Sequence, residues 1–287
     1  MNSDVLPPLS AVRDAVSRAL REDLEPLGDI TGALVGIIDV FATAEIVSRA
    51  EGVVAGRLCV VETFAQVDPS VALHFDVDDA SEVDSGERIA TVSGPLASVL
   101  AGERTALNFL GHLSGIASFT RRHVRAAGGR CRVLDTRKTT PGLRALEKAA
   151  VRAGGGFNHR GSLSDGVLLK DNHLAHVELS EAVRRSKFRW PGRTVQVECE
   201  TLGQVREALA AGADRVMLDN MDLPTIEDTV ELVDGRCEIE VTGGVNLQNL
   251  SDYAATGVDF VSVGALTHSA PVLDIGLDVD VDDHRVD

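Results

Sequence analysis

The chain has 287 residues and a formal net charge of -16, with 44% hydrophobic and 25% charged residues. This length can hold one large domain or two ordinary ones with a substantial core. A strongly acidic chain lacks the basic face that phosphate neutralisation requires, so we expect no nucleic-acid partner. No segment approaches the roughly 20 apolar residues of a membrane helix, and residues 1–10 lack the pattern of a signal peptide. We therefore expect no membrane association.

The four cysteines are far apart and form no CxxC pair: Cys59, Cys131, Cys199 and Cys237. This spacing argues against a zinc site and against a disulfide framework. Three of them stand at or inside apolar runs, so we expect small buried side chains in a reducing, cytoplasmic environment.

The first hundred residues predict a mixed α/β region. Residues 9–24 have apolar side chains at helical spacing, with Ser10 as the expected N-cap. Alternation and glycines in 28–35 and 43–56 indicate strands and turns, and 84–96 is typical of a hairpin-like pair of short strands. Residues 103–127 predict a long amphipathic helix.

After Gly128 and Gly129, short β-rich runs alternate with helical segments. Such alternation predicts βαβ units and a parallel sheet, and its regular spacing favours an α/β barrel. No GxGxxG follows a strand, which argues against a dinucleotide-binding open sheet. The expected strands lie within residues 131–138, 165–170, 194–200, 214–220, 237–244 and 259–265.

Every expected strand end in this region carries charged, hydroxyl or glycine residues. In barrel enzymes the catalytic groups come from these ends. Only four of the 28 basic residues are lysines; two of them stand at strand ends, whereas Lys148 and Lys187 are expected on the solvated surface. The strand-end residues are Arg137, Lys138, Lys170, Glu200, Asp219, Thr242 to Gly244, and Ser262 to Ala265.

The segment 130–170 holds nine basic residues against three acidic ones in an otherwise acidic chain. A local positive region predicts a small, multiply charged anion as the ligand, with arginine suited to carboxylate and lysine or backbone N–H groups suited to phosphate. Glu200 and Asp219 fit sugar hydroxyls or a Mg²⁺ ion that bridges to a phosphorylated sugar. Their alternative role is an ion pair with a nearby lysine. His112 lies in the long helix and is expected to be structural.

The segment 134–173 reads LDTRKTTPGLRALEKAAVRAGGGFNHRGSLSDGVLLKDNH. It closely resembles the signature region of the quinolinate phosphoribosyltransferases, the carboxylating nicotinate-nucleotide pyrophosphorylases of NAD biosynthesis. The resemblance covers nearly the whole chain and departs from the family at Thr242, where a serine is usual. It includes GDIT (28–31), GERTALNFL (102–110), VECE (197–200), LDN (218–220), the TGG turn and SVGALTHSAP (262–271).

The resemblance implies an N-terminal α/β sandwich over residues 1–110, with the tail 268–287 packing back on it. An incomplete (β/α) barrel over 111–267 would carry the active site. It also implies a cytoplasmic homodimer, open to further assembly, whose site borrows Arg104 from the partner subunit. The implied reaction joins quinolinate to phosphoribosyl pyrophosphate, with Mg²⁺ and with loss of CO₂.

The resemblance also assigns roles residue by residue. Lys138 would lie between the two substrates, and Glu200 and Asp219 would face the ribose and Mg²⁺. Thr139 would line the pocket, and His268 is a weaker candidate near the phosphate. The quinolinate carboxylates would be held by Arg104, Arg137, His159, Arg160 and Lys170; the 5-phosphate would be held by Thr242, Gly243, Gly244, Val263, Gly264 and Ala265.

Three other functions remain alternatives at this point. A phosphoribosyltransferase acting on another aromatic acid would use the same sugar donor. A Schiff-base aldolase would use a strand-end lysine. A catalytically silent relative would bind the anion only, although every expected catalytic position is retained.

Overall fold

The computed structural model describes residues 6–35, 37 and 40–280, and the chain divides into two compact units. The first comprises Met1–Arg121, Thr139–Gly155 and Ser269–Asp287, and the second comprises Arg122–Lys138 and Gly156–His268. The expected boundary at 110/111 falls inside a single helix, α4 (Leu96–Ala127). Residues 139–155, expected in the barrel, group with the first unit because their helix α5 (Arg144–Ala153) packs against α1 (Leu9–Leu24).

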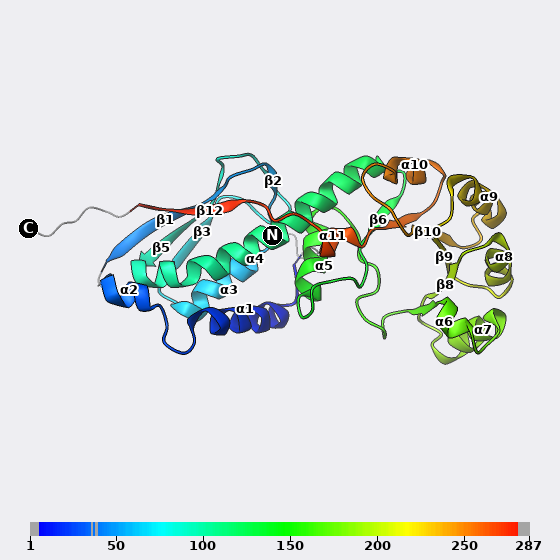
Figure 1. Cartoon of the computed structure of the whole chain (residues 1–287), viewed down its shortest axis with the longest axis horizontal. Coiled ribbons are helices and arrows are strands. Elements are labelled where there is room, and N and C mark those ends of the chain that lie inside the picture. Colours follow the sequence, from blue (N-terminus) through cyan, green and yellow to red (C-terminus); the bar gives the residue numbers. More distant parts are fainter. Residues whose placement is uncertain (1–5, 36, 38–39, 281–287) are drawn as a thin grey trace, which may run out of the picture. The chain divides into compact units, whose positions relative to one another are not determined.

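The first unit is built on an antiparallel sheet in the order β12-β1-β5-β3, with α3 (Arg57–Val67) and α4 against one face (Figure 1). Apolar side chains such as Ile46, Phe64 and Leu110 form its core. The strands are β1 (Phe41–Ser48), β3 (Ala72–Phe75), β5 (Arg88–Pro95) and β12 (Ile275–Asp280), and a separate pair joins β2 (Gly52–Val53) to β4 (Glu82–Val83).

Three local expectations for this unit are wrong. Ser10 lies inside α1, which is preceded by Pro8 and has no side-chain cap. Residues 30–35, expected as strand and turn, form the helix α2 (Ile30–Val35). Residues 84–96 contain one strand, β5, and no hairpin, because β5 pairs with two strands that lie outside this segment, β1 and β3.

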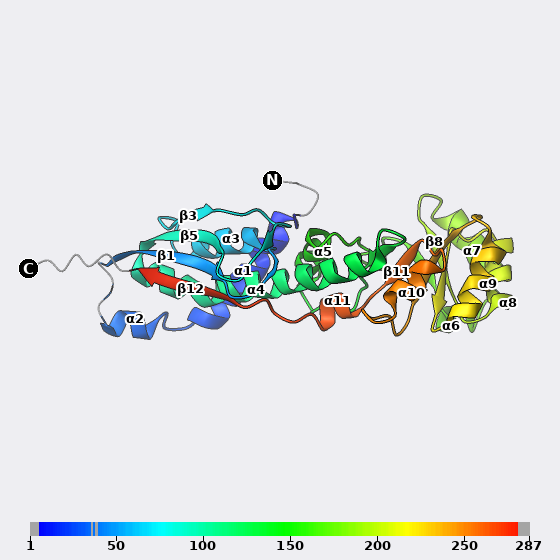
Figure 2. The same cartoon turned by 90° about the horizontal axis from the view of Figure 1, so that it is seen from above.

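The C-terminal segment returns to this sheet. Strand β12 pairs antiparallel with β1, so that Ile46 lies opposite Leu277 (Figure 2). Residues 281–287, which belong to the same expected tail, lie outside the described residues.

The second unit is a parallel sheet in the order β6-β11-β10-β9-β8-β7. Each neighbouring pair is parallel, and the helices α7, α8 and α9 cover the outer side of β8, β9 and β10 (Figure 1). Within the described residues β6 and β7 do not pair, so the barrel is incomplete. This confirms the predicted fold class. Its strands are β6 (Arg132–Leu134), β7 (Val167–Leu169), β8 (Val195–Cys199), β9 (Arg215–Asp219), β10 (Glu238–Thr242) and β11 (Phe260–Ser262).

Helices follow most of these strands because each apolar run needs cover on its outer face. Thr201 caps α8 with its hydroxyl, which accepts a hydrogen bond from the Gln204 N–H, and Asp222 caps α9 in the same way. The helices are α6 (Asp171–Leu174), α7 (Leu179–Arg189), α8 (Leu202–Ala210), α9 (Leu223–Val233), α10 (Leu250–Ala255) and α11 (Ala265–His268).

Lys148 is buried, with 6% of its surface exposed, so its expected surface location is wrong. Neighbouring positions of α5 are buried on several sides, which leaves this lysine little access to solvent. Lys187 is partly exposed and forms an ion pair with Asp214. In the part of the chain that the structure describes, no helix has the length and apolar character needed to cross a bilayer.

Candidate active site

The parallel sheet places most of the predicted site residues along one edge of the second unit. Because the carboxyl ends of parallel strands meet at the same edge, the order of the strands in the sheet gives the order of the functional side chains along that edge. Basic residues stand beyond the two outer strands, β6 and β7, and the glycine turns and carboxylates stand between them. Arg104 and Thr139 belong to the first unit.

Lys138, Gly264 and His268 converge at the β6–β11 side of this edge. A Cβ atom at Gly264 would lie 3.1 Å from Lys138 Cδ and 3.1 Å from His268 Nε2. The Thr267 hydroxyl donates to the Lys138 carbonyl at 2.8 Å and fixes the backbone of the loop after β6. A side chain at position 264 would press against both groups, so glycine lets the lysine and histidine side chains lie this close to the turn.

The turn after β10 depends on two left-handed glycines. Gly243 has φ +87°, and a Cβ there would lie 2.3 Å from the Asn220 Oδ1 atom. The Asn220 N–H donates to the Thr242 carbonyl at 3.1 Å, which ties this turn to the end of β9.

The free backbone N–H groups at the two turns form a set of donors that suits an anion, and we call this set the cradle. Among the described residues, none accepts the N–H of Gly243, Gly244 or Gly264. The N–H of Val263 differs, because it donates to the Leu134 carbonyl at 2.9 Å. The cradle is therefore supplied by the glycines rather than by Val263.

Glu200 and Asp219 stand side by side. Cys199 pairs with Leu218 in the parallel register, which brings the following residues, Glu200 and Asp219, to the same level. Within the described residues neither carboxylate forms an ion pair, so the alternative of a bridge to a nearby lysine is not formed. Lys170 instead pairs with Glu198.

The Glu200 and Asp219 carboxylates suit Mg²⁺, which takes one or two carboxylates and completes its shell with water and phosphate oxygens. The described residues contain no group of three or more His, Cys, Asp or Glu side chains that could hold a metal alone. A metal here would therefore depend on oxygens of the substrate.

Two guanidinium groups form a cationic wall beyond β6. Burial lowers the pKa of Arg160 below its ordinary value, and the charge of Arg137 lowers it further. The buried Nε of Arg137 has no hydrogen-bond partner within the described part of the chain. Two like charges in proximity, one with an unsatisfied buried donor, are stabilised by an anionic ligand.

Four polar residues that the sequence had not marked support this wall. The buried Asp135 carboxylate accepts hydrogen bonds from Asn158 Nδ2 at 2.6 Å and from the His159 N–H at 2.8 Å, which holds the loop that carries Arg160. His159 Nε2 lies 2.9 Å from Gln196 Oε1, and Gln196 Nε2 donates to Glu240 at 2.7 Å. The only available signal was a polar residue inside an apolar strand, as in the VQVEC run of β8.

Arg104 lines a cavity in the first unit. Its side chain is 64% exposed and lies 3.6 Å from the Glu103 carboxylate. The cavity has a volume of about 370 Å³ and is bordered by α1, α4 and the 140–143 loop. His112, another lining residue, has its Nε2 2.9 Å from the buried Glu147 carboxylate, a contact that fits the structural role expected for it.

The loop 139–143 is anchored to α5. Glu147 accepts the Thr140 N–H at 3.0 Å, and the Thr139 hydroxyl accepts a hydrogen bond from Arg144 Nε at 3.0 Å. The chain just beyond Lys138 is thereby fixed by a carboxylate and a hydroxyl.

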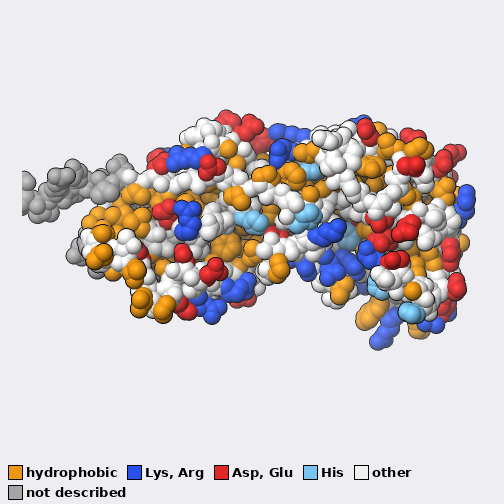
Figure 3. Space-filling model, in the orientation of Figure 1, with side chains coloured by type: hydrophobic (Ala, Val, Ile, Leu, Met, Phe, Trp, Pro, Cys, Tyr) orange, Lys and Arg blue, Asp and Glu red, His pale blue; other side chains and the backbone are white. Residues whose placement is uncertain are grey.

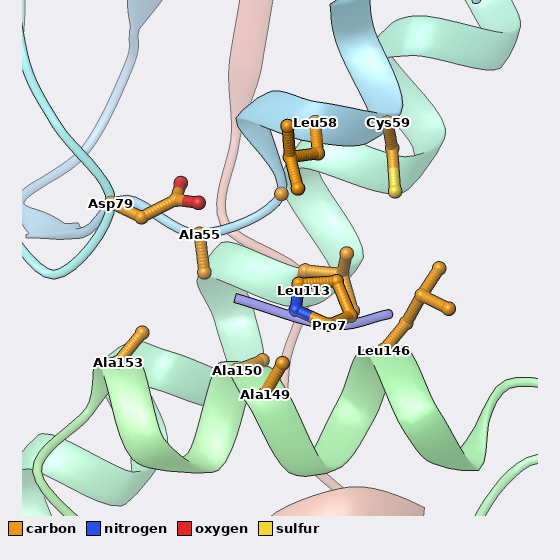
Figure 4. A pocket seen from close by; sticks show the side chains of 11 residues that line it. Pro7, Ala55, Leu58, Cys59, Asp79, Leu113, Leu146, Ala149, Ala150 and Ala153 are labelled. Atoms are coloured by element: carbon orange, nitrogen blue, oxygen red, sulfur yellow. The ribbon is translucent and has the colours of Figure 1, made fainter. Parts of the chain in front are cut away.

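Two further cavities differ in what they could hold. A cavity of about 650 Å³ in the second unit is bordered by Arg160, His173 and Trp190. A cavity of only about 10 Å³ in the first unit is lined mainly by apolar side chains, with Pro7 over the alanine-rich face of α5 (Figure 4). The smaller one has room for about one water molecule and for no substrate.

The fold and the site together have the features of a barrel enzyme for anionic substrates: a parallel sheet with cations, glycine turns and carboxylates at its carboxyl edge. Family models for the N-terminal and C-terminal domains of quinolinate phosphoribosyl transferase match residues 29–114 and 116–278. The chain therefore belongs to the quinolinate phosphoribosyltransferase family.

Named relatives agree with this assignment over most of their length. The nicotinate-nucleotide pyrophosphorylase (carboxylating) of Mycobacterium leprae is 41% identical over 94% of this chain and 97% of its own. A Bacillus subtilis protein named a probable enzyme of the same kind is 44% identical over 85% of this chain and 86% of its own. The solved structure of the Francisella tularensis nicotinate-nucleotide pyrophosphorylase has a TM-score of 0.91 at 38% identity, covering 95% of this chain and 97% of that one.

Proposed function

We propose that this protein transfers the phosphoribosyl group of phosphoribosyl pyrophosphate to quinolinate, releasing pyrophosphate and CO₂ and forming nicotinate mononucleotide. The observation that carries the proposal is the Arg137–Arg160 wall, with its partnerless buried Nε, beside free glycine N–H groups and paired carboxylates at one sheet edge. The carboxylates of a pyridine diacid would neutralise the guanidinium groups, and the phosphate of a phosphorylated sugar would accept hydrogen bonds from the glycine N–H groups. Membership of the family supports the same reaction.

In this proposal the diacid lies against the cations. Arg137 and Arg160 hold one carboxylate side, where planar guanidinium groups match carboxylate geometry. Lys170 faces the other carboxylate, and its ion pair with Glu198 fixes the position of its amine. His159, assigned to the same group by the resemblance, borders it.

The sugar donor lies along the centre of the edge. Gly243, Gly244 and Gly264, together with Thr242 and Ala265, surround the 5-phosphate, and His268 lies beside them. Glu200 and Asp219 face the ribose, and Lys138 stands at the junction of the two substrates. Glu200 and Asp219 would hold Mg²⁺, which neutralises charge on the pyrophosphate when bound.

The chemistry requires positioning and charge more than a covalent nucleophile. The pyridine nitrogen attacks C1 of the ribose while the C1–O bond breaks and its electron pair leaves with pyrophosphate. Glu200 and Asp219 stabilise the positive charge that develops on the sugar, and Lys138 stabilises the departing negative charge. The ring nitrogen is then cationic and stabilises the electron pair left on the adjacent carbon when CO₂ departs, after which that carbon takes a proton.

The direct test is an assay with quinolinate, phosphoribosyl pyrophosphate and Mg²⁺. Production of nicotinate mononucleotide in step with pyrophosphate supports the proposal, and the absence of both contradicts it. Arg137→Lys keeps the charge but removes the bidentate fork, so it is expected to raise the KM for quinolinate by about tenfold. Arg189→Lys, an exposed change on α7, is the matched control.

The same assay separates the remaining candidate functions. A phosphoribosyltransferase for another aromatic acid would turn over nicotinate in place of quinolinate. The aldolase alternative is disfavoured at Lys170, which is ion-paired with Glu198, because a Schiff base requires a free amine. At Lys138 the alternative is left to the experiment. Borohydride trapping with a carbonyl substrate would reverse that judgement.

We also propose a homodimer in which Arg104 of one subunit completes the site of the other. An exposed apolar group on the first unit supports assembly, and Figure 3 shows hydrophobic side chains gathered over α2. This group comprises Leu27, Ile30, Leu34, Val35 and Phe41. A cytoplasmic location stays a prediction.

The shared site has its own test. Arg104→Ala and Lys138→Ala proteins are each expected to be nearly inactive, but their mixture should regain about a quarter of wild-type activity, because statistical exchange makes half of the dimers hybrid with one intact site each. No recovery after demonstrated subunit exchange would contradict the shared site.

A further inference from the structure

A buried row of polar side chains crosses the second unit beneath the candidate active site. Glu240 on β10 is fully buried, and Gln196 on β8 and Ser262 on β11 are each 4% exposed. The Glu240 carboxylate accepts hydrogen bonds from Gln196 Nε2 at 2.7 Å, from Arg215 Nη1 at 3.1 Å and from the Ser262 hydroxyl. Buried charge is costly unless it is hydrogen-bonded in this way. Apolar side chains would fill the same space without that cost, so packing alone does not account for the row.

Glu240 is ionised in this setting. The Arg215 guanidinium, which donates from Nη1 at 3.1 Å, favours the ionised carboxylate. Burial alone would raise the pKa of Glu240, but hydrogen bonds from His159, Ser262 and Gln196 lower it, and the pKa lies below its usual value. Ionised Glu240 has no proton to donate, so it can only accept hydrogen bonds.

The charge on Glu240 sets the direction of every bond that follows. The Gln196 amide must present its NH₂ group to the carboxylate, which turns its Oε1 toward His159 Nε2, 2.9 Å away. His159 must then carry its proton on Nε2, which leaves Nδ1 as an acceptor. The Arg160 backbone N–H donates to that Nδ1 at 2.8 Å.

Both ring nitrogens of His159 are therefore occupied by the protein. The ring cannot contact a substrate carboxylate through a nitrogen without breaking one of these bonds. Its effect falls on Arg160, whose side chain also donates from Nη1 to the Gly166 carbonyl at 3.1 Å. Backbone and side chain of Arg160 are thus fixed independently, close to the charge of Arg137.

We propose that Glu240 and Gln196 are positioning residues that lock His159 in its Nε2–H tautomer, so that His159 places Arg160 for the diacid instead of binding the diacid itself. This inference rests on the proposed function for its kinetic consequences, but the tautomer itself can be measured without any substrate. Glu240 acts on His159 through the Gln196 amide and through its own Oε2, which lies 3.5 Å from His159 Nε2, and it touches no reacting atom.

The first experiment combines kinetics with ¹⁵N NMR of histidine-labelled protein, in which His159 is assigned by substitution. In Glu240→Gln the Gln196 amide is free to rotate so that its NH₂ group faces His159. The ¹⁵N spectrum of His159 should then no longer show the Nε2–H tautomer alone. The KM for quinolinate should rise about tenfold, as expected for losing a bond to a charged group, with little change in the KM for phosphoribosyl pyrophosphate. Glu238→Gln is the matched control, because Glu238 also bonds Arg215 but does not contact His159.

The second experiment compares two substitutions of His159 and does not depend on the folding of the Glu240 variant. The amide of an asparagine reaches the place of Nδ1 and can still accept the Arg160 N–H, whereas the amide of a glutamine reaches the place of Nε2. His159→Asn is expected to lose less affinity for quinolinate than His159→Gln. The reverse order, or equal losses, would overturn the proposal.

The two proposals fail in different ways. A wild-type protein that does not turn over quinolinate contradicts the proposed function, while the tautomer remains measurable. An active wild type whose Glu240→Gln variant keeps both the Nε2–H pattern and the quinolinate KM contradicts this inference alone.

Discussion

The turn after β10 offers a sharp test of the candidate site. Two adjacent glycines there share a left-handed backbone but differ in whether an added Cβ atom would collide with Asn220. Gly243 and Gly244 have φ values of +87° and +61°, so alanine is strained at both. A Cβ at Gly243 would also lie 2.9 Å from the backbone nitrogen of Asn220 as well as 2.3 Å from its Oδ1, whereas a Cβ at Gly244 would meet nothing within 4 Å. Gly243→Ala therefore adds a collision that Gly244→Ala lacks.

The expected costs follow from these contacts. Left-handed backbone costs about 1–2 kcal/mol for a residue with a Cβ, and both variants bear it. The collision with Asn220 involves backbone that cannot rotate away, and overpacking of this kind adds about 1–3 kcal/mol. Gly243→Ala should therefore lower the free energy of unfolding by about 2–5 kcal/mol, and Gly244→Ala by about 1–2 kcal/mol.

Urea unfolding of the two variants measures this difference, and steady-state kinetics measures its effect on the site. Movement of Asn220 would displace the neighbouring Asp219 and the free N–H groups of the turn, so Gly243→Ala should raise the KM for phosphoribosyl pyrophosphate more than Gly244→Ala does. Equal losses of stability in both variants would refute the steric reasoning, since only the shared backbone strain would then remain.

Two further predictions concern buried titratable groups of the first and second units. Burial raises the pKa of Asp79, so its ionisation opposes folding above the folded-state pKa, and this penalty disappears as the pH falls toward the unfolded value. Asp79→Asn should thus stabilise the protein at neutral pH and lose its advantage in acid, as chemical unfolding at several pH values can show; Asp78→Asn should not stabilise it, because the Arg57 bond lowers the pKa of Asp78. Burial raises the pKa of Cys59 and of Cys199 to about 12, so iodoacetamide at pH 8 should leave both thiols unmodified in the folded protein, and mass spectrometry showing rapid native labelling would contradict this.

Several features of the fold were predictable from local patterns. The strands β8 and β9 are apolar runs bounded by polar residues, and they lie within the segments expected for them. The neighbouring positions of Glu200 and Asp219 were also predictable, because the two residues end parallel strands of similar length.

Other features depended on segments far away in the sequence. The stretch 84–96 begins with a turn at 84–87, but its second glycine, Gly94, lies inside β5, because β1 and β3 bond to the two edges of this strand. Lys148 follows a helical pattern that gives no sign of burial, and its environment is set by the elements that surround α5. No local signal distinguishes these cases from a surface turn or a surface lysine.

The sequence by itself determined the parallel α/β unit and the cations, glycines and carboxylates at its strand ends, because hydrophobic periodicity and strand-end chemistry are both written in consecutive residues. Only the tertiary structure decided that 139–155 leaves the barrel unit for the first unit, and that Gln196 and Glu240 form a buried row behind His159. A strand pattern shows which residues alternate, whereas the partners of an inward-facing polar side chain depend on which other strands lie beside it.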